Sequence, residues 1–213
     1  GPAVEHMLPA IRTARLAHPG IAVNMEVATS DVLVAKLLDG SLDFALARRP
    51  RHLGPALFAE RVLAPEPVCL IARAGHPLLR RPALELAETV DYDWVLPLEG
   101  TLLRTTLEAL LVARCIPLPR KVLNTSSILL TLVMVNQTNA VAPMASSVAA
   151  FFAAFGAPDA PIRPLPLAER LEVEPYALLL AAGRSLTPAA RTLYDLVSRQ
   201  LDARTMGTAV AGG

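Results

Sequence analysis

Hydrophobic and polar positions alternate over residues 21–27, which is typical of a half-buried β-strand. The residues that follow favour a helix with Ser30 as its N-cap, apolar residues at helical spacing and a stop at Gly40. Alternation then returns over 42–46. A strand, a helix and a second strand in this order predict a βαβ unit, and hence a parallel sheet.

The rest of the chain predicts an α/β protein of two lobes. The turn at 75–77 interrupts the alternation of elements, and the proline-rich segment 157–166 reads as a crossing. We therefore expect lobe I to comprise 1–73 plus 167–213 and lobe II to comprise 74–166, two Rossmann-like lobes joined by a two-strand hinge around a cleft. The further strands are expected at 57–62, 68–72, 94–97, 122–125, 140–143 and 173–181, and the helices at 4–16, 84–87, 101–114, 127–135, 145–155 and 188–201.

Composition fits a folded domain with an aliphatic core. The 213 residues are 53% hydrophobic, 18% charged and 4% aromatic, which excludes a disordered chain. A net charge of +1 gives no electrostatic argument for nucleic-acid binding by this chain itself. No apolar stretch reaches the ~18–20 residues that span a bilayer, and the start lacks the basic and apolar regions of a signal peptide.

The titratable residues indicate no catalytic or metal chemistry. Cys69 and Cys115 lie too far apart in sequence for a metal pair, and a disulfide framework is not expected. The four histidines show no metal spacing. No nucleophile motif or glycine-rich phosphate loop is present, and Asp91 and Asp93 flank a turn. We therefore expect no enzyme activity, no metal and no cofactor.

Candidate binding chemistry lies where predicted strands give way to helices. Such junctions place hydroxyls and free backbone N–H groups at the carboxyl ends of strands, which suits a carboxylate, a sulfonate or a sugar. Helix capping alone needs the same residues, so both interpretations stay open at this stage. The three junctions are Thr29-Ser30, Gly100-Thr101 and Thr125-Ser126-Ser127.

Three further positions, outside these junctions, are candidates for binding a ligand. Arg48, with Arg49 and Arg51, either faces an anionic effector or lies in a solvated loop. Arg104 lies one turn into its helix and either reaches the cleft or pairs with Glu108. Pro143-Met144 follows a predicted strand, where Met144 either borders a ligand or packs in the core.

Several short motifs, in order, resemble the effector-binding domain of LysR-type transcriptional regulators. The resemblance covers roughly residues 8–200. Asn136 and Asn139 stand where the family usually has glycine, and asparagine tolerates the positive φ of such a turn. The matching motifs are Leu8-Pro9, His18-Pro19, Leu37 with Gly40, Leu42 and Asp43, Gly75-His76-Pro77-Leu78, Trp94 to Pro97 with Gly100, Thr101 and Arg104, Leu132-Val133, and Val141-Ala142-Pro143.

This resemblance implies a fold, a partner and a site. The fold would be that of the type 2 periplasmic binding proteins, with a small effector between the lobes. The first two junctions would belong to the effector pocket, and Pro143-Met144 would border it. The family's N-terminal winged helix-turn-helix is missing here, so DNA would be bound only through that absent domain. A cytoplasmic homodimer or homotetramer is implied, with the helix at 31–38 and the edge strand at 42–46 paired against the second lobe.

Two other functions remain as alternatives. A solute-binding protein of a transport system would share the fold but have no DNA partner. Its gene would encode a signal peptide, whereas that of a regulator would encode an upstream helix-turn-helix. An enzyme on the same scaffold would need a paired nucleophile and base, which the sequence does not supply.

Overall fold

The computed structural model describes residues 3–154 and 161–210 and divides into two compact units. Unit 1 comprises 1–65 and 174–213, and unit 2 comprises 66–173. The sequence placed these boundaries at 73/74 and 166/167. The observed boundaries differ because β3 (Glu66–Arg73) and β8 (Leu171–Val173) pair with each other and belong wholly to the sheet of unit 2.

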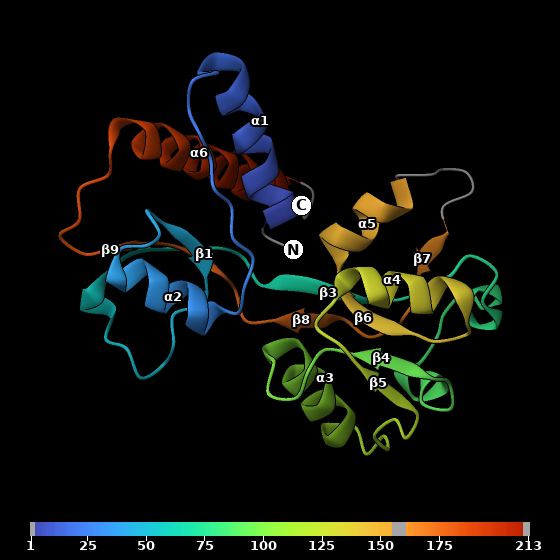
Figure 1. Ribbon diagram of the computed structural model, residues 1–213. Helices are drawn as coiled ribbons and strands as arrows, with labels where there is room; N and C mark the ends of the chain where they lie inside the picture. Colours follow the sequence, from blue (N-terminus) through green and yellow to red (C-terminus); the bar gives the residue numbers. More distant parts are fainter. Residues whose placement is uncertain (1–2, 155–160, 211–213) are drawn as a thin grey trace. The chain divides into compact units, whose positions relative to one another are not determined.

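Unit 1 is a three-stranded antiparallel sheet with helices on both faces (Figure 1). The strand order is β1-β9-β2. Alternation along β9 points Leu179 toward α2, while Leu178 packs against α1 and α6. The elements are η1 (Ala3–Met7), α1 (Leu8–Ala17), α2 (Ser30–Asp39), β1 (Ala45–Ala47), η2 (Pro55–Leu57), β2 (Phe58–Val62), β9 (Ala177–Ala181) and α6 (Pro188–Val210).

Unit 2 contains a four-stranded antiparallel sheet of β6, β3, β7 and β8 and a two-stranded parallel sheet of β4 and β5. An isolated parallel bridge between Trp94 and Val141 links β4 to the start of β6. Leu70 and Trp94 share a core with α3, and α4 and α5 contact β3 (Figure 1). The remaining elements are η3 (Pro77–Arg80), η4 (Leu86–Thr89), β4 (Trp94–Leu96), α3 (Leu102–Ala113), β5 (Val122–Asn124), α4 (Ile128–Gln137), β6 (Ala142–Ala145), α5 (Ser146–Ala154) and β7 (Ile162–Pro164).

The predicted βαβ unit at the start of the chain is wrong. Residues 21–28 form no strand, and β1 pairs antiparallel with β9. Ile21 and Val23 are half-buried, but Val27 is 74% exposed. Alternation shows which face of a segment is apolar, but it does not supply the neighbouring strand that a hydrogen-bond ladder requires.

Two other predictions need correction. The strand expected at 173–181 is divided into β8 and β9, because Pro175 cannot donate to a ladder. The segment 157–166 was expected to cross between lobes, but its described part contains β7, which pairs with β3 inside unit 2. Residues 155–160, including the end of the expected helix at 145–155, lie outside the described residues.

Candidate functional site

Three strands of unit 2, β4, β5 and β6, run parallel to one another, and their carboxyl ends lie on the same side. β4 pairs in parallel with β5, and it also receives a parallel bridge from Val141, just before β6. Backbone bonds support this second pairing, since Val95 donates to Val141 and Val141 donates to Asp93, each at 2.9 Å. The helices α3, α4 and α5 follow these strands, so their N-termini gather at one edge, as the sequence predicts for two of them.

At the start of α3, Thr101 is the N-cap residue but does not cap with its side chain. Its hydroxyl instead donates to the carbonyl of Leu98 at 2.8 Å. Gly100 is exposed and has a φ of +78°, a left-handed conformation that glycine adopts without strain. The simple capping interpretation therefore fails for the Thr101 hydroxyl, and the first-turn N–H groups of α3 receive no acceptor from it.

At the start of α4, capping does occur. The Ser127 hydroxyl accepts from the N–H of Leu130 at 3.2 Å, and the Thr125 hydroxyl accepts from the N–H of Ser127 at 3.0 Å. Ser126 is exposed between them. Of the two serines predicted here, Ser127 is engaged in structure and Ser126 presents its side chain to solvent.

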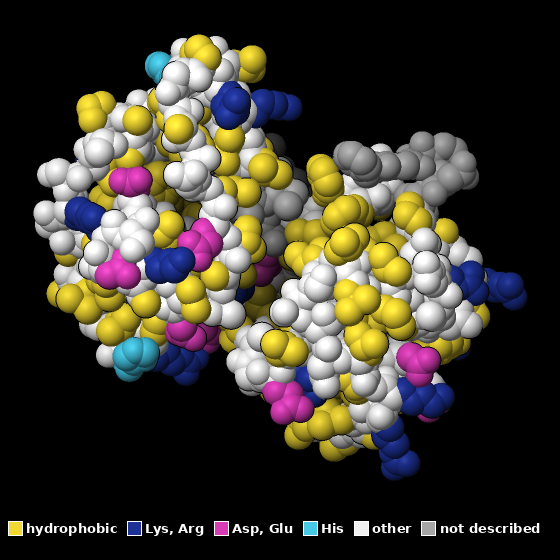
Figure 2. Space-filling model, in the orientation of Figure 1, with side chains coloured by type: hydrophobic (Ala, Val, Ile, Leu, Met, Phe, Trp, Pro, Cys, Tyr) yellow, Lys and Arg dark blue, Asp and Glu magenta, His cyan; other side chains and the backbone are white. Residues whose placement is uncertain are grey.

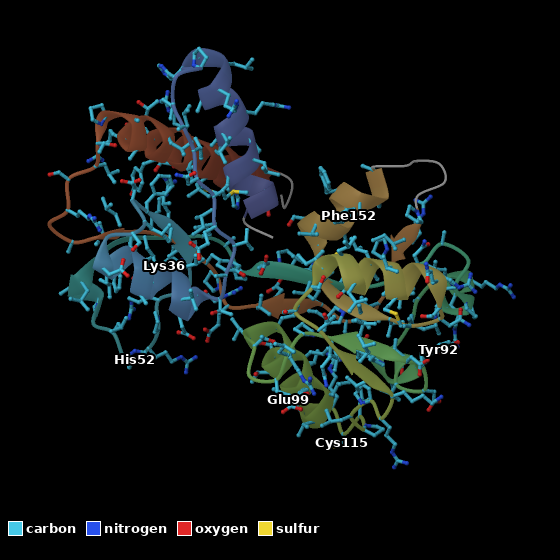
Figure 3. All side chains as sticks on the ribbon, viewed as in Figure 1. Lys36, His52, Tyr92, Glu99, Cys115 and Phe152 are labelled. Carbon is cyan, nitrogen blue, oxygen red and sulfur yellow. The ribbon has the colours of Figure 1, made fainter. Side chains whose placement is uncertain are left out.

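Arg104 joins the two junctions of unit 2, a role that the sequence left undecided. The residue is only 9% exposed. Its guanidinium donates to the carbonyl of Pro97 at 3.2 Å and to the side-chain oxygen of Asn124. The ion pair with Glu108 is present at 2.7 Å, and Glu99 approaches to 3.5 Å at the start of α3 (Figure 3). Arg104 thus fixes the ends of β4 and β5 to each other.

Pro143 and Met144 lie within β6 rather than after it, and both are buried. They pair with Leu70 and Cys69 of β3. Burial raises the pKa of the Cys69 thiol, while a hydrogen bond with Ser146 acts in the opposite direction. The backbone of Pro143 and Met144 leads to α5. The side chain of Met144 is buried, which agrees with the interpretation that it packs in the core.

In unit 1 the predicted N-cap of α2 is wrong by one residue. Thr29 is the N-cap, with its carbonyl accepting from Leu33 at 3.0 Å, and its exposed side chain does not cap. Ser30 is the first helical residue, and its hydroxyl accepts from the N–H of Arg48 at 3.0 Å. The start of α2 is thereby tied to the end of β1.

The three arginines after β1 are all engaged within unit 1. Arg48 is half-buried and donates through Nε to the carbonyl of Glu174 at 2.7 Å. Arg49 pairs with Glu60 at 2.9 Å, and Arg51 pairs with the carboxylate of Glu174. Arg48 and Arg49 are therefore held by contacts within the protein and do not lie free in a solvated loop. The side chain of Arg51, by contrast, is 90% exposed.

Two apolar grooves in unit 2 are lined by other residues. One, of about 190 Å³, lies between α4, α5 and β7 and includes Phe152 (Figure 3). The other, of about 100 Å³, lies between α3 and β8. Over residues 3–154 and 161–210, no group of three or more His, Cys, Asp or Glu side chains could hold a metal ion. No helix within those ranges is long and apolar enough to cross a membrane.

Comparison with known proteins identifies the family. The model of the LysR substrate binding domain matches residues 1–202. The chain therefore belongs to this family, the effector-binding domain of LysR-type transcriptional regulators. It is 38% identical over 193 residues to the HTH-type transcriptional regulator GbpR of Azospirillum brasilense, a match over 90% of this chain and 55% of that protein. GbpR of Rhizobium radiobacter is 41% identical over 71% of this chain and 50% of its own length.

Solved structures confirm the fold class. The regulatory domain of Synechocystis CcmR in complex with 2-PG has a TM-score of 0.75 at 15% identity, covering 93% of this chain and 92% of that one. The effector-binding domain of BenM with benzoate has a TM-score of 0.70 at 16% identity, covering 96% and 90%. The predicted α/β fold of the periplasmic-binding-protein type is therefore correct. The chain spans about half the length of the curated relatives it matches.

Proposed function

We propose that this chain is the sensing part of a longer DNA-binding regulator and that it binds a small organic acid, sulfonate or sugar. The observation that carries the proposal is the edge of unit 2 where the N-termini of α3, α4 and α5 gather. Thr101 and Ser126 supply hydroxyls there, and helix starts supply N–H groups. In unit 1, Thr29 and Ser30 supply the corresponding groups at the start of α2. That the effector lies between the lobes stays a prediction from the resemblance.

The arginines near this site are already bound to other groups of the protein, so we do not assign them to the effector. Arg48 and Arg104 hold carbonyl or carboxylate oxygens of the protein itself. An effector would therefore meet hydroxyls, amide hydrogens and the positive ends of helix dipoles. These groups can bind a carboxylate, a sulfonate or sugar hydroxyls, so an effector from any of the three classes of compound fits the proposed site.

Regulation is favoured over transport because the curated relatives are transcriptional regulators. DNA would be bound by a helix-turn-helix domain outside this chain, in the cytoplasm. An effector would shift the balance between two arrangements of the regulator by its difference in affinity for them, about 1–3 kcal/mol of coupling.

A homodimer or homotetramer is part of the same proposal. Hydrophobic side chains gather over α4 (Figure 2). Ile128 and Leu129 are 55% and 72% exposed there, and α2 exposes Val32 and Leu38. β1 (Ala45–Ala47), which overlaps the edge strand expected at 42–46, lies at one edge of its sheet. We assign these surfaces to a second copy of the chain, with α2 and β1 of one copy against α4 of the other.

A thermal-shift screen of this chain with organic acids, sulfonates and sugars tests the binding site. A compound that binds the folded state raises the unfolding midpoint. Thr101→Ala should lose that shift, whereas Thr105→Ala, an exposed position one turn further along α3, should keep it. The site assignment is wrong if Thr29→Ala, Ser30→Ala and Thr101→Ala all bind as the unchanged chain does.

A further inference from the structure

The chain passes between the two units at 65/66 and 173/174, and the unit 1 ends of these crossings are joined. Leu63, two residues before the first crossing, donates its N–H to the carbonyl of Tyr176 at 2.8 Å. Tyr176 lies two residues after the resumption of unit 1 at Glu174. Any rearrangement of the units must be taken up by the backbone of these two segments.

Arg48 holds the second of these segments by two contacts. Its Nε donates to the main-chain carbonyl of Glu174 at 2.7 Å, so that the bond fixes backbone rather than a mobile side chain. Its guanidinium carbon lies 3.5 Å from the centre of the Tyr176 ring, the geometry of a cation–π contact. Pro175 between them restricts Glu174 to extended backbone, which stiffens the held segment.

The same residue is tied to the start of α2. The N–H of Arg48 donates to the Ser30 hydroxyl at 3.0 Å. The bonds therefore run from Ser30 through Arg48 to Glu174 and Tyr176, and from Tyr176 to Leu63. One end of this chain of contacts is a predicted effector residue, and the other end comprises both crossings.

We propose that Arg48 is a positioning residue that couples the α2 junction to the two crossings. The inference rests on the proposed function, because it gives the effector junction a route to the crossing segments. An effector group that donates a hydrogen bond to the Ser30 oxygen, as a sugar hydroxyl can, competes with the N–H of Arg48 for that oxygen. The loss of the bond between Arg48 and Ser30 shifts the main chain at Arg48 and, through the guanidinium, loosens the segment at 174–176.

Amide hydrogen exchange of this chain without any ligand tests the coupling. Arg48→Ala should raise exchange at 62–66 and 174–178 by about tenfold, the factor expected when a charge-assisted hydrogen bond is lost from a local opening. Exchange in α6 and throughout unit 2 should stay unchanged. Arg51→Ala is the matched control, since Arg51 pairs only at the surface with the Glu174 carboxylate.

The second arm changes the other end of the contacts. Ser30→Ala should raise exchange at 174–178, although Ser30 has no bond to that segment. Ser41→Ala, the same substitution at an exposed position of unit 1, should not. The coupling is overturned if Ser30→Ala leaves 174–178 unchanged, or if Arg48→Ala raises exchange evenly across unit 1, as a merely structural residue would. Because no effector is added, these results are independent of the thermal-shift screen.

Discussion

Cys115 adopts a backbone conformation that its side chain disfavours. Its φ is +57°, and it follows the end of α3. Ile116 donates to the carbonyl of Leu111 at 2.9 Å and Cys115 donates to that of Val112 at 3.0 Å, a helix ending that usually has glycine at the left-handed position. The sequence predicts the end of this helix but gives no sign of the strain, because the bonds and not the residue type impose the conformation.

Cys115→Gly should raise the midpoint of urea denaturation. A Cβ in the left-handed region costs about 1–2 kcal/mol, and the greater freedom of glycine in the unfolded chain offsets part of this, so a gain of about 0.5–1 kcal/mol is expected. The side chain is exposed, so its removal costs little packing (Figure 3). Cys115→Ser keeps the strain and should show no gain. A lower midpoint for Cys115→Gly would contradict this account.

His76 predicts a dependence of stability on pH. It is 1% exposed, its Nδ1 accepts from the N–H of Leu78 at 3.2 Å, and its Nε2 donates to the carbonyl of Asn139 at 3.0 Å. Burial lowers the pKa of His76, with a backbone hydrogen bond to Asn139 acting in the opposite direction. In the unfolded chain a histidine takes up its proton near a pKa of about 6.5. The contribution of His76 to stability is therefore complete above that pH and is lost as the pH falls toward the lowered folded-state pKa.

Thermal unfolding between pH 8 and pH 5 measures this contribution. The unchanged chain should lose stability below about pH 6.5, and His76→Asn should show a shallower loss from a lower starting midpoint. His18→Gln alters an exposed histidine that also precedes a proline, and its curve should run parallel to that of the unchanged chain. Equal slopes for His76→Asn and the unchanged chain would show that another group is responsible.

At the scale of an element, α2 ends at a residue that the sequence identifies and at a contact that it does not. Gly40 has a φ of +93°, and its N–H donates to the main-chain carbonyl of Lys36 at 3.2 Å. Arg184, far along the chain, donates to the carbonyls of Leu37 and Gly40 at 3.3 and 2.9 Å. A positive charge at this end of a helix also complements its dipole.

Gly40→Ala should therefore cost more than the backbone alone requires. A Cβ at Gly40 would lie 2.3 Å from the Arg184 guanidinium, so alanine both strains φ and displaces the cap. Arg184→Ala alone should cost about 1 kcal/mol. In urea denaturation, the effect of Gly40→Ala should be smaller when Arg184 is already alanine. Strictly additive effects would show that the two residues act independently.

The elements that the sequence predicts well are those whose signals are local. The helix end at Gly40 depends on capping. The helix predicted at 101–114 depends on helical spacing, and the strand predicted at 68–72 depends on a run of apolar residues. Residues 21–28 carry an equally clear pattern and form no strand, because a strand also needs a partner. The site shows the same division. Thr101 and Thr29 lie at helix starts, as predicted, but the roles of Arg48 and Arg104 depend on Glu174 and Asn124, which no spacing identifies.

At the scale of the whole molecule, each unit has a core of its own. Leu37 and Leu179 belong to unit 1, whereas Leu70 and Trp94 belong to unit 2. The core of unit 1 is formed by residues before the first crossing and after the second, and the core of unit 2 is formed by residues between the two crossings. A change of arrangement therefore need not disturb either core, which is the property that a sensing domain requires. The apolar face of α4 is one feature of the described residues that neither core explains.

That face predicts the assembly of the chain. Leu129 is 72% exposed on α4, so Leu129→Glu should leave the urea midpoint of the separated monomer almost unchanged. If α4 packs against a second copy, a buried and unpaired carboxylate would weaken the dimer by several kcal/mol, and light scattering should then report the monomeric mass. Val112→Glu, at a 64% exposed position of α3, adds the same charge outside the proposed surface and should remain dimeric. A monomeric mass for the unchanged chain at high concentration, or an equal loss for both variants, would remove α4 from the interface.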